Sequence, residues 1–133
     1  RELKEAGLRI AVASNFDARL HDVVRGIADL AGIEETVISS EVGHRKPGVG
    51  FYRELVRRLG LWPEEAVMIG DDWRNDVRGA REAGMQAIHL RRRGDEDDAA
   101  MNSSNAREDD GSIADGAIRN LRGLVARLRS CRP

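Results

Sequence analysis

Short apolar runs alternate with segments of helical spacing over residues 8–90 of the chain. The runs are four to six residues long and are typical of buried parallel strands. They lie at residues 8–13 (LRIAVA), 36–39 (TVIS), 66–70 (AVMIG) and 85–90 (MQAIHL). Strands that alternate with helices across short loops predict an α/β fold with a parallel sheet and right-handed crossovers.

Helices are predicted between these runs, and glycines mark where they end. Apolar residues recur at helical spacing over residues 18–31 and 47–59, and a further helix is expected to begin near Trp73. Pro47 suits the first turn of a helix, where its missing N–H costs nothing. Each predicted helix is followed by a glycine, which readily takes the left-handed conformation of a helix end. These glycines are Gly7, Gly32, Gly60 and Gly84.

The alternation stops at residue 91. Residues 91–111 open with three consecutive arginines, a run of acids follows, and Met101 is their only large apolar residue, so we expect an exposed loop. Residues 113–118 are typical of a weak edge strand, and residues 120–128 predict a last amphipathic helix. A chain of 133 residues supports one domain, which we divide into residues 1–90, 91–111 and 112–133.

Composition and charge argue against several classes of protein. The chain has 22 Lys and Arg against 23 Asp and Glu, a formal net charge of −1, whereas proteins that bind nucleic acid through bulk electrostatics normally have a basic excess. No apolar run approaches the roughly 20 residues that span a bilayer, and no secretory leader is visible. The single cysteine, Cys131, excludes a disulfide framework. The sequence therefore predicts a cytoplasmic protein with neither a nucleic-acid nor a membrane partner.

Polar side chains follow three of the predicted strands. Ser14 and Asn15 follow the first, Lys46 comes after the second, and Asp71 and Asp72 follow the third. Because ligands bind at the carboxyl ends of parallel strands, these side chains are candidates for one site. Each also has a purely structural interpretation: Ser14 or one of the acids would cap the next helix, and Lys46 would be a solvated loop residue.

Two features of these residues favour phosphoryl chemistry. Asp72 and Asp76 are four residues apart, so on a helix they would share a face and repel each other, whereas a Mg²⁺ ion would turn that repulsion into attraction. The chain uses 20 arginines but only two lysines, and Lys46 offers the compact ammonium that suits a phosphoryl oxygen. A hydroxyl, a lysine and carboxylates supply the donors, the counter-charge and the metal ligands of a phosphoryl-transfer site.

The same residues carry a resemblance to a known family. The string AVASN, which ends in Ser14 and Asn15, resembles the second motif of the haloacid-dehalogenase-like (HAD) superfamily of hydrolases, and RKPGVGFY, which contains Lys46, resembles the third. VMIGDDWRNDVRGAREAGMQAIHL is similar to the fourth motif, and SNFDARL resembles one subgroup of the superfamily. The resemblance covers residues 1–90 and, more loosely, residues 113–128. It implies a three-layer, Rossmann-like α/β domain.

The resemblance also implies a role for each candidate residue. Ser14 and the backbone of Asn15 would bind phosphoryl oxygens, and Lys46 would neutralise the nucleophile and the transferring group. The acidic positions are Asp71, which would ligate Mg²⁺ directly, and Asp76 and Asp72, which would support the ion directly or through water. In such enzymes an Asp on the first strand attacks the phosphoryl group to form an aspartyl-phosphate, and an Asp two positions later acts as general acid and base.

That first motif, Asp-x-Asp after an apolar strand, is missing. Asp95 and Asp97 have this spacing but follow three arginines, and Asp17 lies beyond Ser14, so we reject all three as nucleophiles. Because the chain opens with Arg1 inside a predicted helix, we expect trimmed ends or the later part of a longer protein, without the first central strand and the cap domain.

The missing strand has a structural consequence, since in this superfamily it lies between the strands equivalent to residues 8–13 and 66–70. Its removal would leave two half-sheets, each with an unpaired inner edge. Unpaired buried backbone groups are costly. We therefore expect either that these two strands pair directly, or that a strand from another chain or an N-terminal fragment fills the place between them. We favour the filled place, because it keeps the helices at their native spacing.

Two functions are carried forward. The first is a Mg²⁺-dependent phosphatase that acts on a small phosphorylated metabolite through an aspartyl-phosphate in the parent protein, with this chain inactive alone. The alternative is a non-catalytic remnant that binds phosphate or a protein partner, through self-association or with a complementing N-terminal fragment.

The remaining candidates are expected to have no catalytic part, the histidines being structural or solvated. His21, His44 and His89 have no partner at triad-like or metal-like spacing, so a serine-hydrolase mechanism at Ser14 is rejected. Trp62 and Trp73 are expected to cover the edge of the core, with a substrate-facing role for Trp73 as the alternative.

Overall fold

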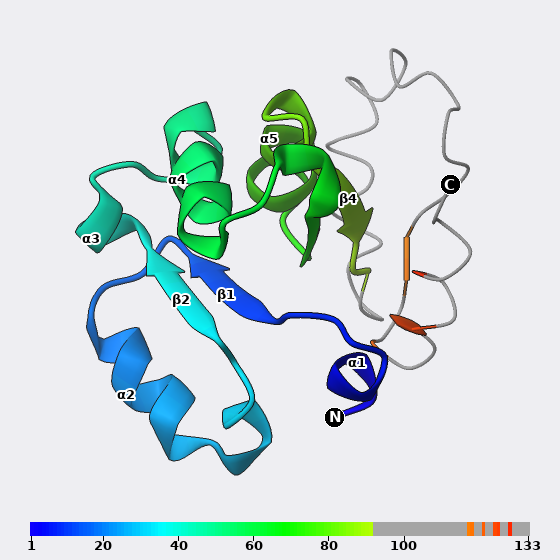
Figure 1. Cartoon of the computed structure of the whole chain (residues 1–133). Helices are drawn as coiled ribbons and strands as arrows, with labels where there is room; N and C mark the ends of the chain where they lie inside the picture. Colours follow the sequence, from blue (N-terminus) through cyan, green and yellow to red (C-terminus); the bar gives the residue numbers. More distant parts are fainter. Residues whose placement is uncertain (92–116, 119–120, 122–123, 126–127, 129–133) are drawn as a thin grey trace.

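The computed structural model describes residues 1–91, 117–118, 121, 124–125 and 128. Helices and strands alternate along the chain (Figure 1), and each of the four predicted apolar runs overlaps a strand. The elements are α1 (Glu2–Glu5), β1 (Ala11–Ser14), α2 (Arg19–Gly26), η1 (Ala28–Leu30), β2 (Glu35–Ile38), α3 (Ser39–Val42), α4 (Val49–Leu59), η2 (Pro63–Glu65), β3 (Val67–Gly70), η3 (Trp73–Arg78), α5 (Gly79–Glu82) and β4 (Gln86–His89).

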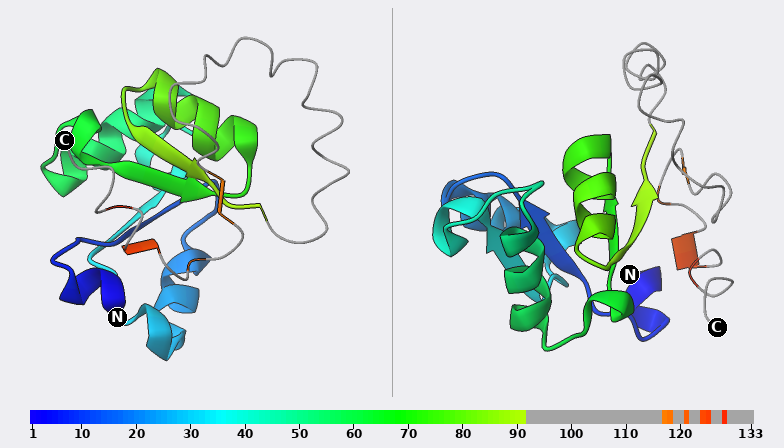
Figure 2. Two further views of the ribbon diagram at one scale, coloured as in Figure 1. Left: turned by 90° about the vertical axis from the view of Figure 1, so that its right-hand side faces the viewer. Right: turned by 90° about the horizontal axis from the view of Figure 1, so that it is seen from above.

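Helices lie on both sides of the strands (Figure 2). α4 and α5 cover one side, and α1 and α2 lie on the other. The strands that pair are parallel. The predicted α/β fold with parallel strands is therefore confirmed.

The strands form two separate two-stranded sheets rather than one. β1 pairs with β2, and β3 pairs with β4, so that Ser14 lies opposite Ile38 and Gly70 lies opposite His89. No ladder joins β1 to β3 among the described strands. These are the two half-sheets expected without the central strand, and the alternative in which the first and third runs pair directly is wrong for this chain.

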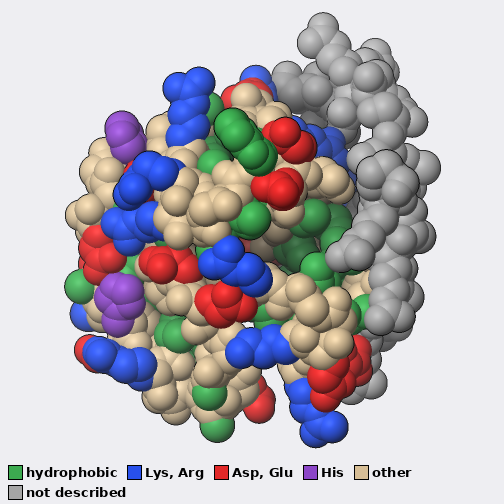
Figure 3. Space-filling view, viewed as in Figure 1, with side chains coloured by type: hydrophobic (Ala, Val, Ile, Leu, Met, Phe, Trp, Pro, Cys, Tyr) green, Lys and Arg blue, Asp and Glu red, His purple; other side chains and the backbone are tan. Residues whose placement is uncertain are grey.

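The side chain of Lys46 bridges the ends of the two sheets. Its ammonium contacts the Ala13 carbonyl on β1 and the carboxylate of Asp76 beside β3, so a polar bridge joins the two sheets in place of a ladder hydrogen bond. On the face seen in Figure 1, hydrophobic side chains line a hollow near the middle of the molecule (Figure 3). A strand supplied by a second chain or by an N-terminal fragment stays a prediction.

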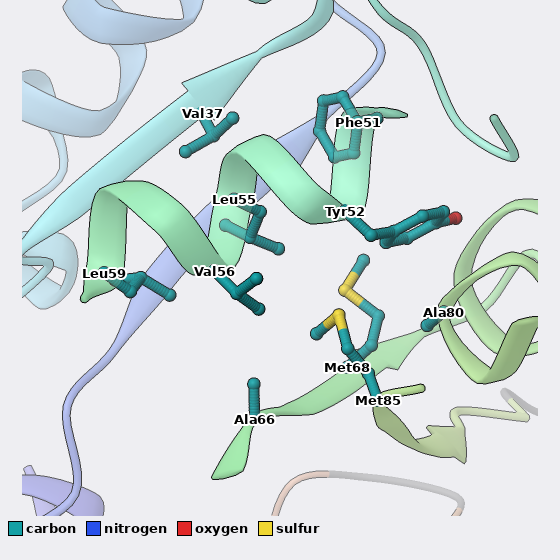
Figure 4. Close-up of a cluster of buried hydrophobic side chains, with 10 residues drawn as sticks. All are labelled: Val37, Phe51, Tyr52, Leu55, Val56, Leu59, Ala66, Met68, Ala80 and Met85. Atoms are coloured by element: carbon teal, nitrogen blue, oxygen red, sulfur yellow. The ribbon is translucent and has the colours of Figure 1, made fainter. Parts of the chain in front are cut away.

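The hydrophobic core lies between the strands and α4 (Figure 4). Phe51 and Tyr52 on α4 are fully buried, and their rings meet edge to face with centroids 5.7 Å apart. Burying a side chain of this size contributes roughly 1.5–3 kcal/mol. The buried cluster consists of Val37, Phe51, Tyr52, Leu55, Val56, Leu59, Ala66, Met68, Ala80 and Met85. Because it includes residues of β2, β3 and α5, α4 holds both sheets together.

Three of the predicted glycine stops are confirmed, and one helix start moves. Gly7, Gly60 and Gly84 have φ angles of 75°, 64° and 86° and follow α1, α4 and α5. α4 begins at Val49 rather than at Pro47, because the Gly48 N–H donates to the Arg45 carbonyl at 2.8 Å and closes a turn first.

The helix predicted over residues 18–31 is interrupted. α2 ends at Gly26, Ile27 takes an extended conformation with φ −106° and ψ 111°, and η1 follows. Glycine and β-branched isoleucine both have low helix propensity, so the break falls at this pair.

The described part of the C-terminal region agrees with its predicted elements. Ile118 forms a parallel bridge with Leu90, and Leu124 is buried. The loop predicted over residues 91–111, apart from residue 91, lies outside the described residues, as does Cys131. None of the described helices has the length and apolar character needed to cross a membrane.

Candidate active site

The polar residues predicted to form a site lie at the carboxyl ends of β1 and β3. Ser14 ends β1 and Asn15 follows it, Asp71 and Asp72 follow β3, and Lys46 lies between α3 and α4. Hydrogen bonds connect Asn15, Lys46, Asp76 and Asp72 in a continuous chain. The structure thus brings most of the predicted residues together.

Lys46 is the centre of this arrangement. It is 9% exposed, and its Nζ donates to Asp76 Oδ1 at 2.5 Å and to the Ala13 carbonyl at 3.1 Å. Asp76 is equally buried, at 6% exposed. Removing one partner of a buried ion pair leaves an uncompensated charge, at a cost of about 3–5 kcal/mol. The interpretation of Lys46 as a solvated loop residue is therefore wrong.

A glycine allows Asp76 to reach this position. Asp76 lies in η3, and its carboxylate turns back over the end of β3, where Oδ2 accepts the Asp72 N–H at 3.2 Å. A Cβ on Gly70 would overlap that carboxylate, so any other residue at position 70 would displace Asp76 from Lys46. Gly70 was not predicted to be a site residue. Its only distinguishing feature in the sequence is that two acids directly follow it.

Asp72 caps η3. Its Oδ1 accepts the Asn75 N–H at 2.8 Å, and its Oδ2 accepts from Asn75 Nδ2 at 2.7 Å, which confirms the capping interpretation for this acid. The Tyr52 hydroxyl donates to the Asn75 carbonyl, so α4 holds the same turn. Burial of Tyr52, and then the nearby carboxylates of Asp76 and Asp72, raise the pKa of Tyr52.

Ser14 does not cap the helix that follows it. The N-cap residue of α2 is Ala18, which makes no side-chain cap, and near that end Asp17 Oδ1 accepts the Arg19 N–H at 3.0 Å. The capping interpretation of Ser14 is therefore wrong. Ser14 is half-buried at the end of β1.

The three candidate metal ligands do not converge on one point. Both oxygens of Asp76 and both oxygens of Asp72 are engaged in the hydrogen bonds given above. Asp71 is exposed, and its carboxylate accepts no hydrogen bond from the described residues. No group of three His, Cys, Asp or Glu side chains arranged to hold a metal occurs in the described part of the chain. Carboxylate oxygens suit Mg²⁺, so the donor chemistry fits while the described residues do not supply a full ligand set.

His89 supports the backbone of Asp71. Its Nε2–H donates to the Asp71 carbonyl at 3.0 Å, and its ring lies edge to face against Trp73 with centroids 5.4 Å apart. Trp73 is half-buried and also contacts the Arg81 guanidinium. A structural role for His89 agrees with the prediction.

His21 lies at the surface, where its Nε2 is 2.7 Å from Glu41 Oε1, in agreement with the predicted structural or solvated role. One other prediction needs correction. Trp62 is 72% exposed, so its predicted role in covering the edge of the core is wrong.

Comparison with known proteins places this arrangement in a family. The profile of the HAD-hydrolase-like family matches residues 43–116. The chain is 38% identical over 92 residues to the glyceraldehyde 3-phosphate phosphatase of Methanopyrus kandleri, with 68% of this chain and 40% of that protein aligned. It is 32% identical over 88 residues to haloacid dehalogenase-like hydrolase domain-containing protein 3 of Bos taurus, with 66% and 35% aligned.

A solved structure agrees. The HAD phosphatase from Thermococcus onnurineus superposes with a TM-score of 0.71 at 28% identity, covering 95% of this chain and 53% of that one. The chain spans about 35–40% of the length of the curated relatives named above. The family profile covers more than half of the chain and includes Lys46, Asp71, Asp72 and Asp76. On these grounds the chain belongs to the HAD-hydrolase-like family.

Proposed function

We propose that this chain supplies the phosphate-binding and acidic part of the active site of a longer HAD-type phosphatase, whose substrate is a small phosphorylated metabolite. The observation that carries the proposal is the buried ammonium of Lys46, held by Ala13 and Asp76 where β1 and β3 end. A fixed cation at the carboxyl ends of parallel strands is suited to stabilise charge on a phosphoryl oxygen. The phosphatase named among the relatives supports the reaction class.

Each residue has a defined part in the proposed site. The Ser14 hydroxyl and the Asn15 backbone N–H would donate to phosphoryl oxygens, and Lys46 would neutralise their charge. Asp76 would hold the lysine, and Asp72 would hold the turn that carries Asp76. Members of the family typically depend on Mg²⁺, which when bound would neutralise phosphate charge. Asp71 is the acid available to ligate it, together with oxygens from outside the described residues.

The nucleophile of this proposal comes from a segment that precedes Arg1. A strand ending in Asp-x-Asp would fit between β1 and β3, with its first aspartate close to Lys46. That carboxylate would attack phosphorus and form an aspartyl-phosphate while the bond to the alcohol oxygen breaks, and the second aspartate would protonate that oxygen. Water would then release inorganic phosphate.

The test compares the two lysines of the chain. The coding sequence upstream of Arg1 is read for a strand ending in Asp-x-Asp, and the full-length protein is assayed for Mg²⁺-dependent phosphate release from a panel of sugar and three-carbon phosphate esters. Lys46→Met is expected to lower kcat/KM by about 10²-fold or more. Lys4→Met is the matched control, because Lys4 is exposed and lies in α1, and its activity should equal that of the wild type.

An activity assay of the 133-residue chain alone helps to distinguish the proposed phosphatase from a non-catalytic remnant. That chain is expected to release no phosphate, because it lacks the nucleophile. Turnover by this chain alone would contradict the proposal, and so would full activity of the Lys46→Met protein. If no Asp-x-Asp strand precedes Arg1 and the full-length protein is inactive, the chain is a non-catalytic remnant instead.

A further inference from the structure

The side chain of Asn15 makes contacts that phosphate binding does not explain. Its Oδ1 accepts the backbone N–H of Lys46 at 2.7 Å, and its Nδ2 donates to the backbone carbonyl of the same residue at 2.9 Å. The two residues are 31 positions apart. Because one amide satisfies both backbone groups of Lys46, as a neighbouring strand would, it fixes the backbone of that residue in position and orientation.

Lys46 needs such a constraint. It lies in the connection between α3 and α4, outside any helix or strand. A lysine side chain loses much rotamer freedom when it is held in one place, and here its ammonium meets one acceptor on β1 and another in η3, the helix that follows β3. Asn15 directly follows β1, the strand whose Ala13 carbonyl accepts from the ammonium. Groups at the end of β1 therefore hold both the backbone and the ammonium of Lys46.

We infer that Asn15 is a positioning residue, whose side-chain amide clamps the backbone of Lys46 and so directs its ammonium to the junction of the two sheets. The use of that ammonium rests on the proposed function, but the clamp itself does not. A direct consequence is that the Asn15 side chain is already engaged, which leaves the Asn15 backbone N–H as the group for a phosphoryl oxygen.

The experiment uses the fact that the chain has only two lysines. The 133-residue chain is treated with an amine-acetylating reagent, and the rates at Lys46 and Lys4 are followed by mass spectrometry, with exposed Lys4 as the reference in every sample. In the wild type Lys46 should react more slowly than Lys4. Asn15→Ala is expected to raise the Lys46 rate relative to Lys4 by about tenfold. Asn15→Asp keeps the acceptor for the Lys46 N–H and loses the donor to the Lys46 carbonyl. Its Lys46 rate relative to Lys4 should therefore lie between those of the wild type and Asn15→Ala.

Arg9→Ala is the matched control for general loosening of the fold. Arg9 Nη1 donates to the Leu59 carbonyl at 2.6 Å, which is also a side-chain-to-backbone bond between distant residues, but it lies at the far end of α4 from Lys46. Arg9→Ala should leave the ratio of the two lysine rates unchanged. An equal rise in Arg9→Ala would overturn the inference, because the effect would then not be local.

The remaining outcomes are also decisive. A folded Asn15→Ala chain, judged by circular dichroism, with Lys46 as protected as in the wild type would overturn the clamp. If Asn15→Ala does not fold, Asn15→Asp is used instead, and a folded Asn15→Asp chain with Lys46 as protected as in the wild type would overturn the clamp. Phosphate, Mg²⁺ and turnover play no part in this measurement. A protected Lys46 in an inactive full-length protein would therefore refute the proposed function and leave the clamp standing.

Discussion

α4 and α2 are both amphipathic helices, yet only one of them is buried. Five residues of α4 are at most 9% exposed. They are Phe51, Tyr52, Leu55, Val56 and Leu59. α2 has no buried residue, and its Val23 is 49% exposed. The two sequences share the spacing that predicts a helix, so the spacing does not account for the difference in burial.

The difference lies in what each helix meets. The core residues of α4 pack with Val37 of β2 and with Met68 of β3, so this helix contacts both sheets. α2 lies on the other side of the strands (Figure 2), where Phe16 and Ile27 beside it are 45% and 43% exposed. Helix formation depends on local pattern, whereas the stability of a helix in a protein comes mostly from what packs on its apolar face. The two sides of the molecule should therefore respond differently to the same substitution.

The largest contrast is expected from one alanine substitution made at a glycine on each side. A Cβ on Gly79 would lie 2.6 Å from the Tyr52 hydroxyl and 2.9 Å from Pro47 Cβ. Gly79→Ala should therefore lower the free energy of unfolding by about 1–3 kcal/mol. Gly26 ends α2, and a Cβ there would meet nothing within 4 Å. Gly26→Ala should raise the free energy of unfolding by about 0.4–1 kcal/mol, because it restricts the unfolded chain.

Urea unfolding followed by circular dichroism measures both variants. The two substitutions are expected to change the free energy of unfolding in opposite directions. Alanine has a higher helix propensity than glycine at both positions, so helix propensity alone would not produce that result. A Gly79→Ala protein more stable than the wild type would mean that α4 and the start of α5 are not in close contact.

A smaller contrast is expected from valine. Val56 on α4 is 6% exposed, so Val56→Ala should lower the free energy of unfolding by about 1.5 kcal/mol, the transfer and cavity cost of two methyl groups. Val23→Ala on α2 should change it by no more than about 0.5 kcal/mol. Equal losses at the two sites would break the comparison, because they would mean that α2 is covered in solution. Repeating the measurement at several protein concentrations would show whether a second copy covers it.

The order of the elements was predictable from the sequence because it depends on local pattern. Apolar runs gave all four strands, and the glycine stops at Gly60 and Gly84 were read from residue type alone. The division into two sheets follows from the absence of the central strand that the family places between the first and third runs. The contacts across that division were not predicted. The bridge made by Lys46 is one that spacing does not reveal.

The site shows the same limit. Polar residues that follow the strands pointed to Lys46, and the four-residue spacing from Asp72 pointed to Asp76. The sequence left open whether Asp72 caps a helix, as the structure shows it does. The contacts of Asn15 with Lys46 join residues 31 positions apart. The space that Gly70 leaves for Asp76 is a tertiary property as well. The sequence therefore predicted side chains that lie together in the structure, but not how they hold each other.

The smallest effect is expected at the polar surface of α4. Glu54 accepts hydrogen bonds from Arg57 and then Arg58, which lower its pKa from 4.5 to about 2. Because the folded pKa lies below the unfolded one, these contacts stabilise the fold above about pH 4.5, and that contribution is lost as the pH falls towards 2. Between these values the Tm of the wild type should fall more steeply than that of Glu54→Gln, by a small amount because the pair faces solvent. Asp22→Asn on α2 is the control for removing a carboxylate from an exposed ion pair. Parallel curves for wild type and Glu54→Gln would mean that the arginines hold Glu54 no better than water does, and the polar surface of α4 would then resemble that of α2.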